Sequence, residues 1–190
     1  MLIVTRMAFR FLCLITLLGF SAVSGAQGTA QVYLSNSSGE RYLIGDLVTA
    51  DKEQGVEFQF SLKNETFADY FLSMRPFRCL ESDGRMVCYL PYPYEKPTVF
   101  TDAEMRPLEY DFLFIHRKKK DYGIDPWNGV YYKLSWHEGG LQGQAHAVDL
   151  NVLASPPENG VIYPLSDTDL HTIESDQLWL PMLEVVGLEQ

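Results

Sequence analysis

The clearest hydrophobic pattern in the chain is a strict alternation of apolar and polar residues over 56–62. The apolar positions of this stretch are Val56, Phe58, Phe60 and Leu62, and the residues between them are polar. Successive side chains of a β-strand point to opposite faces, so this period predicts a strand with one buried and one wet face. Antiparallel sheets tolerate such a wet face, which favours antiparallel pairing.

The stretch 76–90 predicts a β-hairpin whose register is fixed by its turn. Asp83-Gly84 is a preferred pair for a two-residue type I′ turn, because both positions need positive φ. Counting outward from this turn places Cys79 opposite Cys88, at a non-hydrogen-bonded pair. The Cα separation at such a pair, about 4.5 Å, suits a disulfide, so we predict a Cys79–Cys88 bridge. The face that carries the cysteines is the more apolar, so the bridge is expected to point into the core.

A second hairpin is predicted over 130–150, with Gly139-Gly140 as its turn. This turn places Trp136 opposite Gly143, so that large side chains meet small ones across the strands, as a close-packed interior requires. The opposite face of this hairpin, which carries several polar residues, is expected to be wet.

Turn signals at short intervals along the rest of the chain complete an all-β pattern. About ten short strands and few helical periodicities predict an antiparallel small barrel or sandwich with one or two short helices. The alternative is an α+β fold, in which the segment 64–74 and the segment after Ser166 are helices packed on an antiparallel sheet. We further expect a frayed terminus at 27–30, and a helical turn that opens at 101–104 and stops at Pro107.

The first 26 residues have the pattern of a secretory signal peptide. Two arginines precede the apolar run 11–20, and small residues occupy the expected cleavage positions at 24–26. A retained membrane anchor is the alternative, but the run is short for about 30 Å of hydrocarbon. We therefore expect a single β-rich domain over 27–190, without a transmembrane segment and located in the periplasm or secreted. Cys13 leaves with the signal peptide, so the two remaining cysteines are both used in one bridge.

The charge of the expected mature chain excludes one class of partner. Without the two arginines of the leader, 13 basic residues stand against 25 acidic ones, which gives a formal charge of −12. A surface of this sign repels polyanions, so we expect no nucleic-acid partner. The same charge opposes binding of lipid headgroups by the lysine cluster 118–120, which is expected to be a solvated loop.

The sequence lacks the common motifs of covalent catalysis. Both mature cysteines are expected to be bridged, and neither a Gly-x-Ser-x-Gly elbow nor a Ser-x-x-Lys motif is present. The four histidines, at positions 116, 137, 146 and 171, have no spacing typical of metal ligands. We therefore predict no catalytic residue, no metal and no cofactor, and interpret the histidines as solvated side chains.

An aromatic and proline-rich segment at 89–94 provides the best candidate for a binding surface. Flat rings with polar tips suit a groove for an extended peptide or a sugar, although tyrosines also pack along the rim of a sheet. Two arginines lie close by in the sequence and could bind a carboxylate. A rigid bridged hairpin would hold the segment in place, so we predict a partner-binding surface bordered by Arg75, Arg78, Tyr92 and Tyr94.

Three strings of the sequence resemble segments of a group of exported bacterial proteins of unknown function. They are Ser73-Met-Arg-Pro-Phe-Arg-Cys79, Cys88-Tyr-Leu-Pro-Tyr-Pro-Tyr94 and Tyr122-Gly-Ile-Asp-Pro-Trp-Asn-Gly-Val-Tyr-Tyr132. The similarity would cover roughly residues 55–183. The resemblance implies export and is compatible with the disulfide, but it implies no activity and no site residues.

Two hypotheses of function follow. The first is an exported, non-enzymatic β-domain that binds either a small apolar or amphipathic ligand in a barrel, or an envelope protein or glycan along an aromatic groove. The second is a hydrolase or isomerase of the cell envelope that uses carboxylates. An enclosed apolar pocket would favour the first hypothesis, and two or more carboxyl groups with raised pKa values in one cleft would favour the second.

Overall fold

The computed structural model describes residues 27–158, 160–173 and 177–188, so the predicted signal peptide lies outside the described residues. One α-helix, α1 (Arg106–Glu109), accompanies short 3₁₀ turns at Asn64–Thr66, Pro126–Asn128, Leu150–Ala154 and Asp167–Asp169. The strands are β1 (Gln27–Ser35), β2 (Arg41–Lys52), β3 (Gly55–Leu62), β4 (Ala68–Phe71), β5 (Pro76–Ser82), β6 (Arg85–Tyr89), β7 (Val99–Phe100), β8 (Leu113–Lys118), β9 (Gly129–His137), β10 (Gly140–Val148), β11 (His171–Thr172) and β12 (Met182–Val186).

These strands form one antiparallel sheet, which confirms the all-β prediction. Its order is β4-β5-β6-β8-β9-β10-β12-β1-β2-β3-β7, and β11 pairs with β10. The segment 64–74, which the α+β alternative made a helix, forms a 3₁₀ turn followed by β4. That alternative also expected a helix after Ser166. The structure has the short 3₁₀ turn Asp167–Asp169 there, capped by Ser166.

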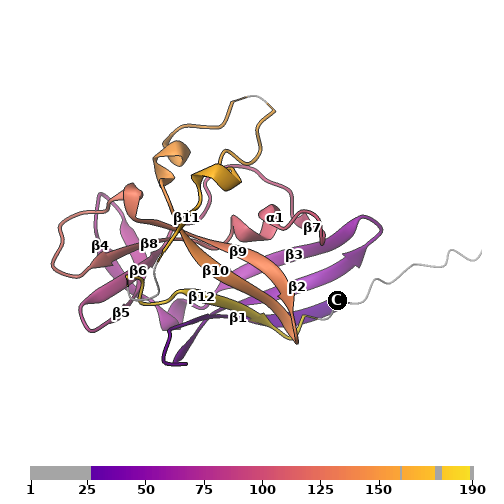
Figure 1. Ribbon diagram of the computed structural model, residues 1–190, viewed down its shortest axis with the longest axis horizontal. Helices are drawn as coiled ribbons and strands as arrows, with labels where there is room; N and C mark the ends of the chain where they lie inside the picture. The colour runs from indigo at the N-terminus through magenta and orange to yellow at the C-terminus, as the bar shows by residue number, and fades with distance from the viewer. Residues whose placement is uncertain (1–26, 159, 174–176, 189–190) are drawn as a thin grey trace, which may run out of the picture.

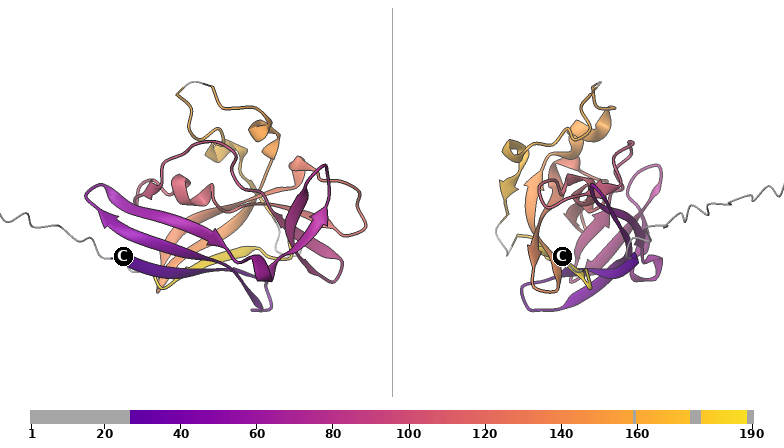
Figure 2. Two further views of the ribbon diagram at one scale, coloured as in Figure 1. Left: turned by 180° about the vertical axis from the view of Figure 1, so that it is seen from behind. Right: turned by 90° about the vertical axis from the view of Figure 1, so that its right-hand side faces the viewer.

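The sheet is strongly curved and wraps around the main hydrophobic core (Figures 1 and 2). Phe60 of β3 meets Tyr89 of β6 with ring centroids 6.3 Å apart, although these strands are distant in the sheet order. Phe60 also packs edge-on against Phe112, 5.1 Å away, and the ring of Phe112 is fully buried. The four apolar residues predicted on one face of β3 all belong to this core or pack against it, so the alternation over 56–62 was interpreted correctly.

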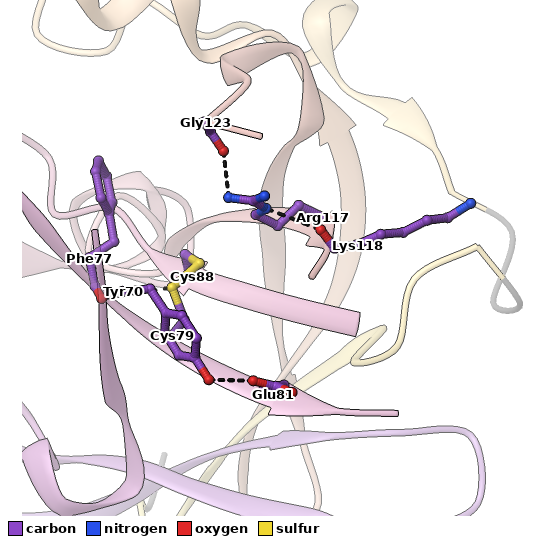
Figure 3. Close-up of a disulfide and its surroundings, with 8 residues drawn as sticks. All are labelled: Tyr70, Phe77, Cys79, Glu81, Cys88, Arg117, Lys118 and Gly123. Carbon is purple, nitrogen blue, oxygen red and sulfur yellow. Dashed lines mark hydrogen bonds between the residues drawn. A yellow bond between two sulfur atoms is a disulfide. The ribbon is translucent and has the colours of Figure 1, made fainter. Parts of the chain in front are cut away.

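The hairpin β5–β6 has the predicted turn and register. Asp83 and Gly84 both have positive φ, 50° and 73°. Cys79 pairs with Cys88 and is bonded to it, with the Cα atoms 4.0 Å apart (Figure 3). The bridge is buried in a hydrophobic core, as expected, but this core is not the main one. The bridge belongs to a smaller cluster on the outer face of the sheet, with Phe77 and Met86, whereas the alternate residues of the hairpin face the main core.

The hairpin β9–β10 differs from its predicted register by two residues. Its turn is Glu138-Gly139, so Trp136 pairs with Leu141 rather than Gly143, and Leu134 is the residue opposite Gly143. The cause is Gly140, whose φ of +150° brings it so close to β12 that a Cβ atom would lie 1.9 Å from the Val185 carbonyl oxygen. Gly140 is therefore needed inside the strand. A slip of two residues keeps the faces unchanged. Leu134 and Tyr132 therefore still meet small residues, Gly143 and Ala145, although Trp136 meets Leu141.

Two further local expectations are corrected by the structure. Residues 27–30 are not frayed, because they belong to β1 and pair with residues 47–50 of β2. Pro107 does not stop a helix but lies in the first turn of α1. A proline is well suited to that position, because the first N–H groups of a helix have no partner within the helix. The pairing of β1 with β2 contains a bulge near Gly45, since its register shifts between Val32 and Tyr33.

The observed register makes a prediction about Gly143. A Cβ atom at this position would lie 2.9 Å from Leu134 Cδ2 and 3.1 Å from Tyr132 Cβ, both in the main core. We expect Gly143→Val to lower the free energy of unfolding by about 1 to 3 kcal/mol through overpacking. The matched control is Gln144→Val, next in sequence and exposed, which should change little. Denaturant titration measures both variants, and equal small effects would contradict the register.

Candidate functional site

The four residues of the predicted binding surface lie in two separate settings. Arg75 is exposed and its guanidinium lies 5.3 Å from the ring centroid of Phe77. Arg78 forms an ion pair with Asp69 of the neighbouring strand, with Nε 3.3 Å from the carboxylate. Neither arginine has an ion pair or hydrogen bond with the two tyrosines among the described residues. The prediction that the four residues border one surface stays a prediction.

The two tyrosines of the predicted surface hold a covering segment onto the sheet. The Tyr92 hydroxyl donates to the Ile162 carbonyl oxygen at 3.0 Å, and the Tyr94 hydroxyl donates to that of Leu153 at 2.9 Å. The ring of Tyr92 also packs edge-on against Tyr110, with centroids 4.8 Å apart. These contacts use the polar tips of both side chains within the chain itself. The aromatic segment therefore anchors residues 150–158 and 160–165 over the outer face of the sheet.

A polar cleft lies beside this covering segment, between α1, the middle of β9 and residues 165–170. Its volume is about 520 Å³, which is within the range of small-molecule sites. Four carboxyl groups and two cations line it, namely Asp102, Glu104, Glu109, Asp167, Arg106 and Lys133. We refer to it as the polar cleft. A second hollow, lined by Gln142 and Gln144 among others, shares Lys133 and Leu134 with it and continues over the outer face of β10.

Glu109 is the only one of the four carboxyl groups of the polar cleft that is buried, with 4% of its surface exposed. Strand β8 pairs with β9 only as far as Tyr131, so the N–H of Leu134 has no strand partner on that side. Glu109 replaces this partner: its Oε1 accepts from the Leu134 N–H at 2.7 Å, and its Oε2 accepts from the Tyr131 hydroxyl. Burial raises the pKa of Glu109, and these two hydrogen bonds lower it in part.

The other charged groups of the polar cleft have partners within the chain. Lys133 Nζ lies 2.7 Å from the Asp167 carboxylate, and this contact, which bridges β9 and the segment 165–170, lowers the pKa of Asp167. Arg106 forms an ion pair with Glu104, which lowers the pKa of that carboxyl group. The Trp136 indole N–H donates to Asp102 at 2.7 Å. The walls of the cleft are therefore held in place by these contacts, as a pre-organised binding site requires.

A cluster of tyrosines lies beneath Arg106 at one end of the polar cleft. The guanidinium of Arg106 lies 4.8 Å from the ring centroid of Tyr163, which packs 5.0 Å from Tyr110. The Tyr110 hydroxyl accepts from the N–H of Leu165 at 2.9 Å, so it fixes the start of the segment that closes the cleft. Burial raises the pKa of Tyr163 to about 12, and its hydroxyl has no hydrogen-bond partner among the described residues.

The polar cleft could not be predicted from the sequence. One sequence feature does indicate a buried acid. Glu109 is a charged residue within the strongly apolar stretch 108–116. Its partners Tyr131 and Leu134 are more than 20 positions away in the sequence, and no local pattern connects them. The face of β9 that is expected to be wet carries Tyr131, and this expectation is wrong for that residue, because Tyr131 is buried in a cluster on the outer face of the sheet.

Neither a metal centre nor a membrane-spanning helix is found in the part of the chain that the structure describes. No three side chains of histidine, cysteine, aspartate or glutamate are arranged there to hold a metal ion. No helix among the described residues is long and apolar enough to cross a membrane. Comparisons with protein-family models, with curated proteins and with solved structures found no match.

Proposed function

We propose that this protein is an exported, non-enzymatic β-domain that binds a hydroxyl-rich ligand, such as an envelope glycan, in the polar cleft. The observation that carries the proposal is a cleft of about 520 Å³ whose charged walls are fixed by internal contacts. Carboxylates and amides are suitable partners for hydroxyl groups, because each can accept a hydrogen bond. The adjoining hollow with Gln142 and Gln144 would extend the binding surface for a ligand of several units.

The first hypothesis also allowed a small apolar ligand inside a barrel, and the proposal does not include such a ligand. The side chains that point into the curved sheet are packed against one another, and Phe112, Phe114 and Tyr132 are fully buried among them. The ring centroids of Phe114 and Tyr132 are 6.0 Å apart. An interior filled in this way provides support for a ligand on the outer face rather than within the sheet.

Export is part of the same proposal. The apolar leader with its preceding arginines supports removal of residues 1–26, and the Cys79–Cys88 bond supports an oxidising compartment. We therefore place the ligand in the periplasm or outside the cell. The resemblance to exported proteins of unknown function agrees with this location.

Native mass spectrometry of the protein isolated from its own compartment tests the proposal, followed by titration with the species that co-purifies. A polar, hydroxyl-rich species is expected, and binding should change the fluorescence of Trp136, whose indole N–H donates to Asp102 of the cleft wall. Asp102→Ala and Lys133→Ala should each weaken binding by about tenfold, which is 1.4 kcal/mol. The matched control is Asp51→Ala, an exposed carboxylate on β2. A lipid as the bound species, or equal affinities for all variants, would contradict the proposal.

Hydrolysis with Glu109 as a general acid is the second candidate function. Its support is the raised pKa of a buried carboxyl group that lines a cleft. However, the pKa values of Glu104 and Asp167 in the same cleft are lowered, and both oxygens of Glu109 accept hydrogen bonds from the chain. Cleavage of the co-purifying ligand, abolished by Glu109→Gln without loss of binding, would favour this function over simple binding.

A further inference from the structure

Strand β8 extends beyond its neighbour β9 and leaves a notch in the sheet. It pairs with β9 through Leu113–Ile115, and its last residues, His116–Lys118, pair only with β6. A cavity of about 460 Å³ lies at this notch, remote in the fold from the lining of the polar cleft. Its lining includes Arg85, His116, Lys118, Asn128, Gln177 and Trp179. We call it the notch cavity.

Two cations face each other at the rim of the notch cavity. Arg85 of β6 is the direct partner of Lys118 of β8 in the antiparallel register. Like charges at opposed positions destabilise a sheet. Lys118 has no ion pair among the described residues, and the nearest carboxylate to Arg85 is that of Asp83, 4.0 Å away and highly exposed. This arrangement is unfavourable unless a negative charge lies between the two cations.

The alternation of side chains along β8 places His116 on the same face as Lys118. Figure 3 shows the intervening residue, Arg117, turned the opposite way, toward the Gly123 carbonyl oxygen, to which its guanidinium donates. Arg117 also lines the cavity, but its guanidinium is already bonded to the backbone carbonyl oxygens of Lys118 and Gly123, so we do not count it among the donors of the rim. His116 is half-buried, has no hydrogen bond among the described residues, and burial lowers its pKa. Its imidazole is therefore available to a ligand as an N–H donor.

The remaining lining residues provide amide donors and an apolar wall. Asn128 and Gln177 each carry a side-chain amide. Trp179 is 5% exposed and belongs to the main core, as does Val87 on the adjacent strand. Asp121 is the one acid among the lining residues, and its carboxylate accepts from the Lys118 backbone N–H at 3.2 Å. The cavity therefore has a cationic rim in a chain with a strongly negative total charge.

We propose that the notch cavity binds a small ligand through an anionic group, a phosphate or a carboxylate, held between Arg85 and Lys118 with His116 as a third donor. Arginine and lysine are the side chains that bind such groups most strongly. The volume is sufficient for a small organic anion. This site is independent of the polar cleft, whose lining contains more acids than bases, so either proposal can fail without the other.

Calorimetric titration of the purified protein with two probes, inorganic phosphate and succinate, tests the notch cavity. We expect saturable binding at one site and a shift of the His116 ring resonances in NMR spectra. The relative affinity of the two probes identifies the natural group as phosphate or carboxylate. Arg85→Gln and Lys118→Gln should each weaken binding at least tenfold. The melting temperature of the free protein should not fall in either variant, because both side chains are exposed and each substitution removes a like-charge repulsion.

The matched control is Lys120→Gln, which removes the same charge from an exposed position outside the notch cavity and should change the affinity less than twofold. An equal loss of affinity in this control would mean that the anion is held only by diffuse attraction to the positive charges, and it would overturn the proposal. The absence of saturable binding by both probes would overturn it as well. Glu174 and Asp176 lie outside the described residues. Binding seen only in the variant Glu174→Gln/Asp176→Asn would assign the neutralising charge to the chain itself and would also overturn the proposal.

Discussion

Gly140→Ala is expected to destabilise the protein by about 3 kcal/mol or more, because it would force β10 and β12 apart where their pairing begins. The new Cβ atom would lie 1.9 Å from the carbonyl oxygen of Val185 and 3.0 Å from its carbonyl carbon. Both are backbone atoms and cannot move without separating β10 from β12. The φ of +150° adds strain for any residue with a side chain. Effects of this size are confined to a few mechanisms, among which overpacking and backbone strain are two.

The neighbouring Gly139 provides the matched control for this prediction. It also has a positive φ, +82°, but an added Cβ atom would meet no atom within 4 Å. Gly139→Ala should therefore cost only the left-handed conformation, about 1 to 2 kcal/mol. Urea denaturation of both variants separates the two contributions. If Gly140→Ala were no more harmful than Gly139→Ala, the close approach of β10 to β12 would be refuted.

The turns of the two hairpins show why the register of one could be predicted from the sequence and that of the other could not. Asp83-Gly84 specifies its turn locally, so the β5–β6 register and the disulfide follow from neighbouring residues alone. Glu138, Gly139 and Gly140 allow two different two-residue turns. The choice between them depends on β12, which contacts β10 from about 40 positions further along the chain. Tertiary contact therefore decides the register of the second hairpin.

The candidate sites depend on tertiary contacts to a greater degree. The prolines of the segment 91–97 fit its place outside the strands, since the structure describes no strand between Tyr89 and Val99. The sequence could not show that Tyr92 and Tyr94 use their hydroxyls on the carbonyl oxygens of Ile162 and Leu153, because these partners lie about 60 to 70 positions away. The polar cleft likewise exists only because α1, β9 and the segment 165–170 meet in the folded chain.

Glu109→Ala is the second substitution with a large expected effect. It would leave the N–H of Leu134 and the hydroxyl of Tyr131 without their acceptor, and both groups are buried. Each unsatisfied buried group costs about 1 to 3 kcal/mol, so we expect a total loss of about 3 kcal/mol in the free energy of unfolding. In Glu109→Gln, the amide oxygen can still accept from Leu134, and the amide N–H can donate to the Tyr131 oxygen. This variant should therefore stay within about 1 kcal/mol of the parent near neutral pH.

The pH dependence of stability separates the titration of Glu109 from any change in packing that the substitutions cause. Because the pKa of Glu109 is raised in the folded state, the folded chain holds more protons than the unfolded chain between the ordinary carboxyl pKa and the raised value. Stability must then fall as the pH rises through this window. Asp111, whose pKa is also raised by burial, contributes with the same sign in all three proteins. The difference between parent and Glu109→Gln therefore isolates Glu109. Denaturation measured across this window should show that Glu109→Gln gains stability relative to the parent as the pH rises, and a constant difference would mean that Glu109 is not buried as a titrating acid.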